Sequence, residues 1–467
     1  MSTPNTHYSC EQLDVMLHDA RAIYFLGIGG ISVSSLASLS AQQGFRVGGY
    51  DRTVTPLVRR LMDAGIPVDT LACAENIDGY DAVVYTVAIS DEQPEYIEAK
   101  KRGLPLISRS NYMGYLMRAY RHRIGIAGTH GKSSTTGMCA EIFAAAQRAP
   151  TVLCGAEMPG LGGAYCVGAQ DTLIFEACEY MDSFLDFYPT TAVVLNTELD
   201  HVDYFESLAR MCRSYTAFGD KVGESGTVIY NADDAACTDA MQSCAGRRVS
   251  FGIEADADYR AADVRVENGR QSFSLYIRGK HVGRISMCVH GRHNVYNALA
   301  AAAAAAEQGV CTRAIAAGLE GFCGVHRRME FKATLNGAAV YDDYAHHPTE
   351  IRAALDAARV MSDGRVVCAF QSHTFSRTAA LFDQFVDALQ LADAVIIAPI
   401  YAAREQNTFG VSEKALAQAL CSRGVLADCG MDFEDTAKKL RALLSPGDVA
   451  LVMGAGDVEK VYPYLFS

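Results

Sequence analysis

The chain has 467 residues, half of them hydrophobic, which predicts a packed globular protein of about three domains. Its formal net charge of −13 argues against a nucleic-acid-binding protein. The polar segment 1–19 and the lack of any apolar run of about 18 residues argue against secretion and membrane insertion. The cysteines form no C-x-x-C pair, which favours reduced thiols in a cytoplasmic protein over a zinc site.

A glycine loop follows the first predicted strand. The apolar run 22–26 predicts a buried strand, the glycines follow at once, and 32–43 has helical spacing. Glycines in such a loop let the backbone approach a phosphate closely. The candidate nucleotide-binding residues of this loop are Gly27, Gly29 and Gly30.

A second predicted strand, 46–50, ends at Asp51, about twenty residues past the glycines, where dinucleotide-binding folds place a ribose ligand. The match is partial because Ser32 occupies the third glycine position. The loop therefore either binds a nucleotide or only permits close packing of strand and helix. Further predicted strands at 82–86 and 106–108, with a helix at 93–102, complete a Rossmann-like domain over 1–120.

A second glycine loop opens the predicted central domain, 121–321. An apolar strand end at 124–127 runs directly into Gly128, Thr129, His130, Gly131, Lys132, Ser133 and Ser134. Backbone N–H groups and a helix start suit phosphate binding; Lys132 would reach the outer phosphates and the Ser133 hydroxyl would ligate Mg²⁺. The usual P-loop would have glycine at Ile126, so a glycine turn with a solvated lysine is the alternative.

Other polar residues of this domain follow predicted strands. Glu176 follows 172–175 and His201 lies shortly after 191–195, so both are candidate metal ligands; a helix cap and a turn hydrogen bond are the alternatives. Segments 226–230 and 264–289 alternate like antiparallel strands. Asn294 and Asn297 lie one helical turn apart at the head of an alanine-rich helix and suit contact with a base edge.

The third predicted domain, 322–467, has the βαβ rhythm of a parallel sheet, which makes the whole chain an α/β protein. Its predicted strands lie at 340–343, 365–370, 394–398 and 449–453. Two of them end in clustered His, Asp and Arg residues, which form either a solvated loop or a substrate-binding wall.

Four passages together resemble the Mur ligases of peptidoglycan synthesis. They are Gly27-Ile-Gly-Gly30, Gly128-Thr-His-Gly-Lys-Ser133, Gly291-Arg-His-Asn-x-x-Asn297, and Asp342-Asp-Tyr-Ala-His-His-Pro-Thr349 with Gln371-x-His-x-x-Ser-Arg-Thr378. Their order and spacing span nearly the whole chain. The chain is most similar to members that add the first amino acid, L-alanine, to UDP-N-acetylmuramate.

The resemblance implies an ATP-dependent ligase with a P-loop-type central domain, which uses Mg²⁺, forms an acyl phosphate and lets L-alanine attack it. It assigns the UDP part to the first domain, the phosphates to Lys132 and Ser133, and metal to Ser133, Glu176 and His201. It implies that Asn294 and Asn297 contact the adenine base. It also implies that Arg328 and Asp343 of the third domain bind the nucleotide. Tyr344, His346 and Arg377 would bind the amino acid. Catalytic roles would fall to Lys132, His201, Arg328, Asp343 and His346.

The chain departs from the family pattern at three places. Ser133 stands where many members have Thr, Thr374 stands where others carry Arg, and Glu176-Ala-Cys-Glu-Tyr replaces Glu-Ala-Asp-Glu-Ser. Two alternatives remain: a family member that attaches a tripeptide to the same nucleotide sugar, and a non-enzymatic sensor of nucleotides. The sequence leaves the oligomeric state open.

Overall fold

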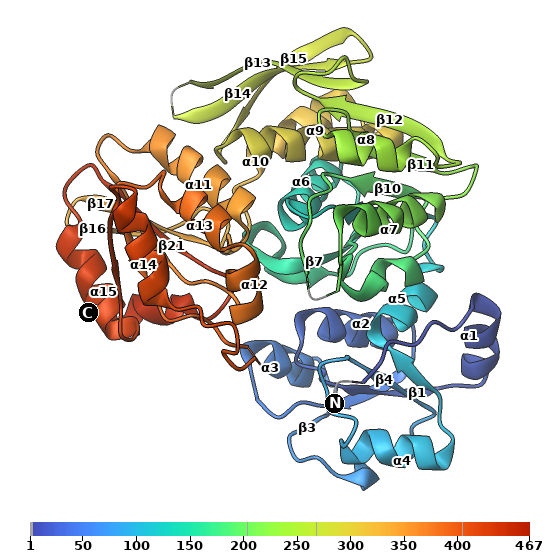
Figure 1. Cartoon of the computed structure of the whole chain (residues 1–467). Coiled ribbons are helices and arrows are strands. Elements are labelled where there is room, and N and C mark those ends of the chain that lie inside the picture. Colours follow the sequence, from blue (N-terminus) through green and yellow to red (C-terminus); the bar gives the residue numbers. More distant parts are fainter. Residues whose placement is uncertain (1–2, 203, 268, 404) are drawn as a thin grey trace. The chain divides into compact units, whose positions relative to one another are not determined.

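The computed structural model describes residues 3–202, 204–267, 269–403 and 405–467. The chain divides into two compact units. Unit 1 comprises Met1–Thr197, Cys212–Phe251 and Ala300–Gly318, and unit 2 comprises Glu198–Met211, Gly252–Leu299 and Leu319–Ser467. The α/β class predicted from the sequence is confirmed, because helices alternate with mostly parallel strands (Figure 1). The domain boundaries at residues 120 and 321 stay a prediction.

The first sheet of unit 1 is parallel throughout and has the order β3-β2-β1-β4-β5. Its strands are β1 (Ala22–Leu26), β2 (Arg46–Tyr50), β3 (Val68–Asp69), β4 (Ala82–Tyr85) and β5 (Leu106–Ser108). Its helices are α2 (Ile31–Gln42), α3 (Pro56–Asp63), α4 (Pro94–Arg102) and α5 (Arg109–Met117), and α1 (Cys10–Leu17) precedes β1.

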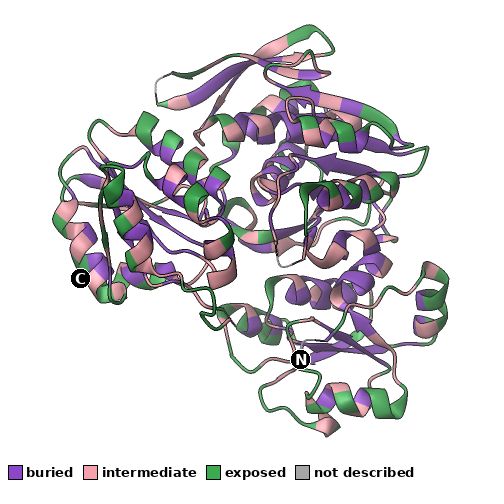
Figure 2. Ribbon diagram, viewed as in Figure 1, coloured by how far each residue is buried: buried purple, intermediate pink, exposed green. Residues whose placement is uncertain are grey.

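Helices cover both faces of this sheet, which explains why β1 is apolar at every position. Side chains alternate between the faces of a strand. Tyr24 of β1 packs in a core with Ala99 of α4, whereas its neighbour Phe25 contacts the ring of Tyr112 in α5. All five residues of β1 are therefore buried (Figure 2).

The second sheet has, among its strands in unit 1, the order β12-β11-β10-β6-β9-β7-β8. Its strands are β6 (His122–Ala127), β7 (Thr151–Met158), β8 (Gly163–Cys166), β9 (Thr172–Glu176), β10 (Thr191–Val194), β11 (Thr227–Asn231) and β12 (Arg247–Gly252). The neighbouring helices in the chain are α6 (Lys132–Ala145), α7 (Leu208–Asp220), α8 (Ala235–Met241), α9 (Arg292–Glu307) and α10 (Thr312–Gly321).

The antiparallel prediction for segment 226–230 is wrong, because β11 runs parallel to both β10 and β12. Four of its five residues are buried, as expected for a strand covered on both faces rather than one with a solvated side. The prediction for 264–289 agrees with the structure. In unit 2, β13 (Tyr259–Glu267), β14 (Arg270–Ile277) and β15 (Lys280–Met287) pair antiparallel.

The C-terminal sheet lies in unit 2 and has the order β16-β17-β21-β18-β19-β20. Its strands are β16 (Glu330–Leu335), β17 (Ala338–Asp343), β18 (Val366–Phe370), β19 (Ala394–Ile397), β20 (Leu426–Cys429) and β21 (Val449–Met453). Its helices are α11 (Pro348–Met361), α12 (Phe375–Ala380), α13 (Phe382–Leu389), α14 (Glu413–Ser422), α15 (Phe433–Leu443) and α16 (Tyr462–Leu465). Only the β16–β17 pair of this sheet is antiparallel within the described residues.

Two apolar layers sandwich this sheet. One core joins Leu355 of α11 and Phe385 of α13 to β18 and β21, and the other joins Leu440 of α15 to the opposite faces of the same strands. The sheet is thereby fixed from both sides, so the residues that follow its strands are held at defined positions.

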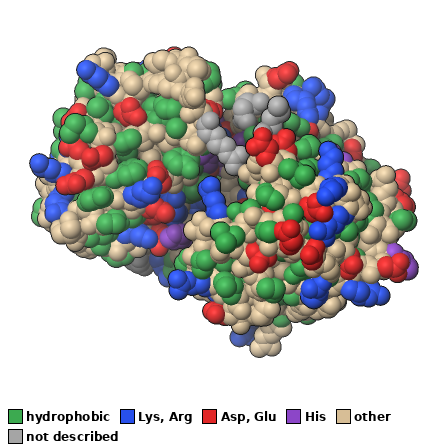
Figure 3. All heavy atoms as spheres, turned by 90° about the horizontal axis from the view of Figure 1, so that it is seen from below, with side chains coloured by type: hydrophobic (Ala, Val, Ile, Leu, Met, Phe, Trp, Pro, Cys, Tyr) green, Lys and Arg blue, Asp and Glu red, His purple; other side chains and the backbone are tan. Residues whose placement is uncertain are grey.

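The charged side chains and the cysteines can be located on the structure. Figure 3 shows acidic and basic side chains intermingled over the visible face. All fifteen cysteines lie among the described residues and are free thiols. Across the described part of the chain, none of the helices has both the length and the apolar character that a membrane span requires.

Candidate active site

The segment 128–134, which we call the phosphate loop after its predicted role, comprises the connection between β6 and α6 and the first residues of α6, all in unit 1. Gly128 has φ 139° and Gly131 has φ 87°, backbone conformations that favour glycine. A Cβ atom at Gly128 would also lie only 2.9 Å from Cβ of Leu195. The two glycines are therefore required by the backbone path of the loop itself.

Asn196, which follows β10, holds this loop in place. The N–H of His130 donates to Asn196 Oδ1 at 2.8 Å, and Asn196 Nδ2 donates to the carbonyl of His130 at 3.0 Å. Both bonds are side chain to backbone, so they fix the course of the chain rather than a side-chain rotamer. Asn196 directly follows the predicted strand 191–195, and the sequence analysis assigned it no function.

The predicted phosphate-binding lysine is paired within unit 1. Lys132 Nζ donates to the carbonyls of Gly128 and Thr129, and lies 3.0 Å from Glu179 Oε2. Burial disfavours its charged form, but the nearby carboxylate outweighs that effect, and the pKa of Lys132 is raised. The ammonium group is therefore charged at neutral pH and shares its site with Glu179, a residue that sequence reasoning missed.

Two predicted metal ligands come together around Cys154 of β7. The Cys154 thiol lies 2.9 Å from Glu176 Oε1 and 3.8 Å from the backbone oxygen of Ser133. The N–H of Gly155 also donates to Glu176 Oε1, at 2.6 Å. One carboxylate oxygen of Glu176 is thus fixed by β7, next to the first turn of α6. The third predicted metal ligand, His201, is part of unit 2.

The first glycine loop, 27–30, is tied to Asp51. The N–H of Gly29 donates to Asp51 Oδ2 at 2.9 Å, and a Cβ atom at Gly29 would approach this oxygen to 2.7 Å. Gly27 has φ 77°, and Gly30 N-caps α2 without a side-chain hydrogen bond. Asp51 therefore shapes the loop, and its assignment to the ribose stays a prediction.

The predicted adenine contacts, Asn294 and Asn297 of α9, are buried and bonded to each other. Asn297 Nδ2 donates to Asn294 Oδ1 at 3.1 Å, and Asn294 Nδ2 donates to the carbonyl of His290 at 2.7 Å. The structure thus brings the two amides together as the helical spacing predicted. Their contact with a base stays a prediction.

Asp343 is the last residue of β17, and its carboxylate accepts two backbone hydrogen bonds. The N–H of Ala345 donates to Oδ1 at 2.7 Å and that of Met329 to Oδ2 at 2.8 Å. Burial raises the pKa of Asp343 to about 6, and nearby Arg328 opposes this shift. Arg328 lies 3.6 Å from Glu350 and 5.3 Å above the ring of Tyr344.

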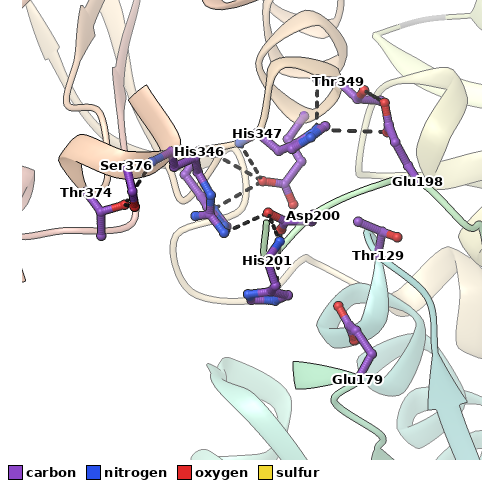
Figure 4. A network of polar contacts seen from close by, with 12 residues as sticks. Thr129, Glu179, Glu198, Asp200, His201, His346, His347, Thr349, Thr374 and Ser376 are labelled. Carbon is purple, nitrogen blue, oxygen red and sulfur yellow. Dashed lines mark hydrogen bonds and ion pairs between the residues drawn. The ribbon is translucent and has the colours of Figure 1, made fainter. Parts of the chain in front are cut away.

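Arg377, the predicted partner of the alanine carboxylate, already contacts a carboxylate of unit 2. Its Nη2 lies 2.7 Å from Oδ1 of Asp200, a carboxylate labelled in Figure 4, and both side chains are nearly buried. Burial alone would raise the pKa of Asp200, but Arg377 outweighs it, so that pKa lies well below its usual range. The pairing joins residues 177 positions apart and was not predicted.

His201 and His346 lie near the same carboxylate in unit 2. The N–H of His201 donates to Asp200 Oδ1 at 2.7 Å, and His201 has φ 49°. The Nδ1 of His346 lies 3.0 Å from the carbonyl of Tyr344, which can only accept, so Nδ1 carries the proton. Burial lowers the pKa of His346 to about 4, although Glu350 opposes the shift. The neutral ring therefore keeps a lone pair on Nε2.

Thr374, which stands where the resemblance implies an arginine, N-caps α12. Its hydroxyl accepts from the N–H of Arg377 at 3.4 Å, and its backbone has φ 64° and ψ 149°, a combination that costs energy in a residue other than glycine. Ser376 beside it donates its N–H to Glu405 at 2.8 Å. Thr374 therefore orients the helix that carries Arg377.

Family comparisons agree with this arrangement of strands and loops. Models described as the Mur ligase family catalytic domain, the Mur ligase middle domain and the Mur ligase glutamate ligase domain match residues 22–121, 126–305 and 327–456. A UDP-N-acetylmuramate–L-alanine ligase of Caldanaerobacter subterraneus is 39% identical, covering 96% of this chain and 98% of its own. The chain belongs to the Mur ligase family. It is therefore an ATP-dependent ligase, as the resemblance predicted.

Other relatives of this Mur ligase give the same result. A protein of the same name from Lachnospira eligens is 42% identical, covering 94% of this chain and 96% of its own. The crystal structure of a UDP-N-acetylmuramate–alanine ligase from Thermotoga maritima has a TM-score of 0.79 at 28% identity, covering 95% of this chain and 98% of the other. A murein peptide ligase from Psychrobacter arcticus shares the fold, with a TM-score of 0.69 at 23% identity. The match covers 95% of this chain and 98% of the other.

Proposed function

We propose that this Mur ligase joins L-alanine to UDP-N-acetylmuramate and converts ATP to ADP and phosphate in the same reaction. The observation that carries the proposal is the full-length similarity, at 36–42% identity, to relatives named for this reaction. A phosphate loop whose backbone is held by two hydrogen bonds to Asn196 supports it. The alternative of a non-enzymatic sensor is not supported, because the chain belongs to a family of ligases.

The first chemical step transfers a phosphoryl group. A carboxylate oxygen of UDP-N-acetylmuramate attacks the γ-phosphorus of ATP, the bond to the β-phosphate oxygen breaks, and an acyl phosphate forms with ADP as leaving group. Such a transfer depends on positioned positive charge. Lys132 would supply it by exchanging Glu179 for the γ-phosphate, with Gly128, Gly131 and the first turn of α6 donating N–H groups.

Mg²⁺ fits the donors next to this loop. The Ser133 hydroxyl and the Glu176 carboxylate are hard oxygen ligands, and the Cys154 thiol contacts both Glu176 Oε1 and the backbone oxygen of Ser133. The bound ion would neutralise charge on the phosphate oxygens. We assign Ser133 and Glu176 to this ion and keep His201 as a third, predicted ligand.

The second step forms the amide. The amine nitrogen of alanine attacks the acyl carbon, the carbon–oxygen bond to phosphate breaks, and phosphate leaves. The amine must lose a proton, and Nε2 of neutral His346 is an acceptor for it. Arg377 would bind the alanine carboxylate through the guanidinium nitrogens that do not contact Asp200, with Tyr344 beside it.

An assay of phosphate release tests the proposal. UDP-N-acetylmuramate, ATP and Mg²⁺ should give phosphate with L-alanine, and omission of any one should abolish it. The tripeptide L-alanyl-γ-D-glutamyl-meso-diaminopimelate replaces alanine in a parallel reaction, because a tripeptide-adding ligase is the alternative within the family. Turnover with the tripeptide and none with alanine would contradict the proposal. The cytoplasmic location that the sequence indicates stays a prediction.

A further inference from the structure

Arg109 brings a positive charge to the first glycine loop. It is the first residue of α5, directly after β5, and its Nη1 donates to Ser32 Oγ at 2.9 Å. Ser32 is the second residue of α2, which Gly30 N-caps without a side-chain hydrogen bond. The serine that interrupts the glycine pattern thus orients a guanidinium group at the point where α2 begins.

This guanidinium has no carboxylate partner among the residues that the structure describes. Asp186 attracts it, yet the two Asp186 oxygens accept from Ser110 Oγ at 2.6 Å and contact His7 Nδ1 at 2.8 Å. Burial lowers the pKa of Arg109, although arginine stays protonated. The side chain is only partly buried, so solvent and ligands reach it. A partly desolvated cation without a carboxylate partner is stabilised by binding an anion.

The electrostatics also relate Arg109 to the phosphate loop within unit 1. Burial and Glu179 raise the pKa of Cys178, whereas Lys132 and Arg109 both lower it. The two cations therefore both lie close enough to Cys178 to act on it. An anion bound by Arg109 would lie between the first glycine loop and the residues around Lys132.

We propose that Arg109 is a substrate-binding residue that holds an acidic group of the UDP-sugar, either its diphosphate or its carboxylate. This inference rests on the proposed function. A planar guanidinium can take either group through two parallel hydrogen bonds. The diphosphate would add Arg109 to the N–H groups of the glycine loop. The carboxylate would be the oxygen nucleophile itself, held on the side of Lys132.

Calorimetry with matched ligands tests the assignment. Arg109→Gln should weaken binding of UDP-N-acetylmuramate by about tenfold or more and leave ATP affinity within about twofold. Arg109→Lys keeps the charge but loses the planar group, so its affinity for UDP-N-acetylmuramate should lie between those of wild type and Arg109→Gln. Arg118→Gln is the matched control, because Arg118 caps the other end of α5 and pairs with Asp14.

A second ligand distinguishes the two acidic groups. UDP-N-acetylglucosamine has the diphosphate and lacks the carboxylate. If Arg109→Gln weakens both ligands equally, the residue holds the diphosphate; if it weakens only UDP-N-acetylmuramate, the residue holds the carboxylate. Unchanged binding of both in a variant with wild-type melting temperature would overturn the inference. If Arg109→Gln does not fold, the comparison rests on Arg109→Lys, whose wild-type affinity and KM for the UDP-sugar would overturn it too.

Failure of the proposed function gives a different result. In that case the wild-type protein releases no phosphate with UDP-N-acetylmuramate and alanine. A wild type that turns over and an Arg109→Gln variant with unchanged KM for the UDP-sugar would overturn this inference alone.

Discussion

The phosphate loop of unit 1 and the polar cluster of unit 2 formed by Asp200, His346, Glu350 and Arg377 are built differently. The loop takes its shape from glycines and backbone hydrogen bonds within a short stretch, closed by Asn196. The cluster consists of side chains brought together by the fold, including the Arg377–Asp200 pair. A loop of the first kind depends on backbone geometry, whereas a cluster of the second kind depends on charge balance among side chains.

Removal of the loop cation should have the largest effect. Lys132→Ala removes the group expected to strengthen its contact as the γ-phosphoryl group moves, so kcat should fall at least about a hundredfold, roughly 3 kcal/mol. Melting temperature and phosphate release together measure it. Lys100→Ala, an exposed lysine of α4, is the control. Near-normal turnover of Lys132→Ala would remove this loop from the active site.

A side chain in the first glycine loop should disturb a second backbone-built site. Gly29→Val would push against Asp51 Oδ2 and Val58 Cγ2, at 2.7 and 2.8 Å from the new Cβ atom. We expect UDP-sugar affinity to fall roughly thirtyfold, about 2 kcal/mol, with ATP affinity nearly unchanged. Gly321→Val adds the same side chain in open space and serves as control. Calorimetry that finds the loss on ATP instead would mean that the two loops are assigned in the wrong order.

The side-chain cluster should respond to geometry at constant charge. Arg377→Lys keeps the positive charge opposite Asp200 but loses the planar group, so KM for L-alanine should rise about tenfold, or roughly 1.4 kcal/mol. KM for ATP should change much less. Steady-state kinetics with each substrate varied in turn measure both values, and an unchanged KM for alanine would leave Arg377 as the structural partner of Asp200.

The smallest effect is a pH dependence of stability. The pKa of His346 is about 4 in the folded protein, below its ordinary value of 6.5, so the unfolded chain binds more protons between these values and stability falls as pH drops through this range. Asp343, whose pKa is raised to about 6, acts in the opposite direction. His346→Gln should reduce the loss of unfolding free energy between pH 7 and 5 by on the order of 1 kcal/mol.

Urea unfolding at the two pH values measures this difference. His18→Gln replaces an exposed histidine and is the control. Identical pH dependence in wild type and His346→Gln would show that the His346 ring is not held neutral by burial.

The sequence predicted the elements that are buried and locally encoded. The predicted strands 22–26, 46–50, 106–108 and 449–453 match β1, β2, β5 and β21 residue for residue. Weakly apolar elements were missed, such as β20, half of whose residues are exposed. The direction of β11 was mispredicted because a short apolar segment encodes burial and not the orientation of its neighbours.

The candidate site divides in the same way. The phosphate loop could be predicted because its residues are consecutive and each has a local physical reason. The contacts of Arg377 with Asp200 and of Arg109 with Ser32 could not, because they join residues 177 and 77 positions apart and depend on how sheets and helices pack. Glu350 carried a local signal, since it is the third residue of α11 and closes a capping box with His347.

The rate at which the Cys154 thiol is alkylated can report local opening next to the candidate metal ligands Ser133 and Glu176. It is buried, and its pKa is raised well above the ordinary value, mainly by burial, so it reacts with alkylating reagents only when β7 separates from β9 and α6. Its rate of labelling therefore equals the frequency of that separation whenever reaction outpaces reclosing. Ligands that hold Ser133 and Glu176 more firmly against this strand would lower the rate of Cys154 labelling. The ratio of the labelling rates without and with ligand would report the binding free energy of the ligand without any measurement of turnover.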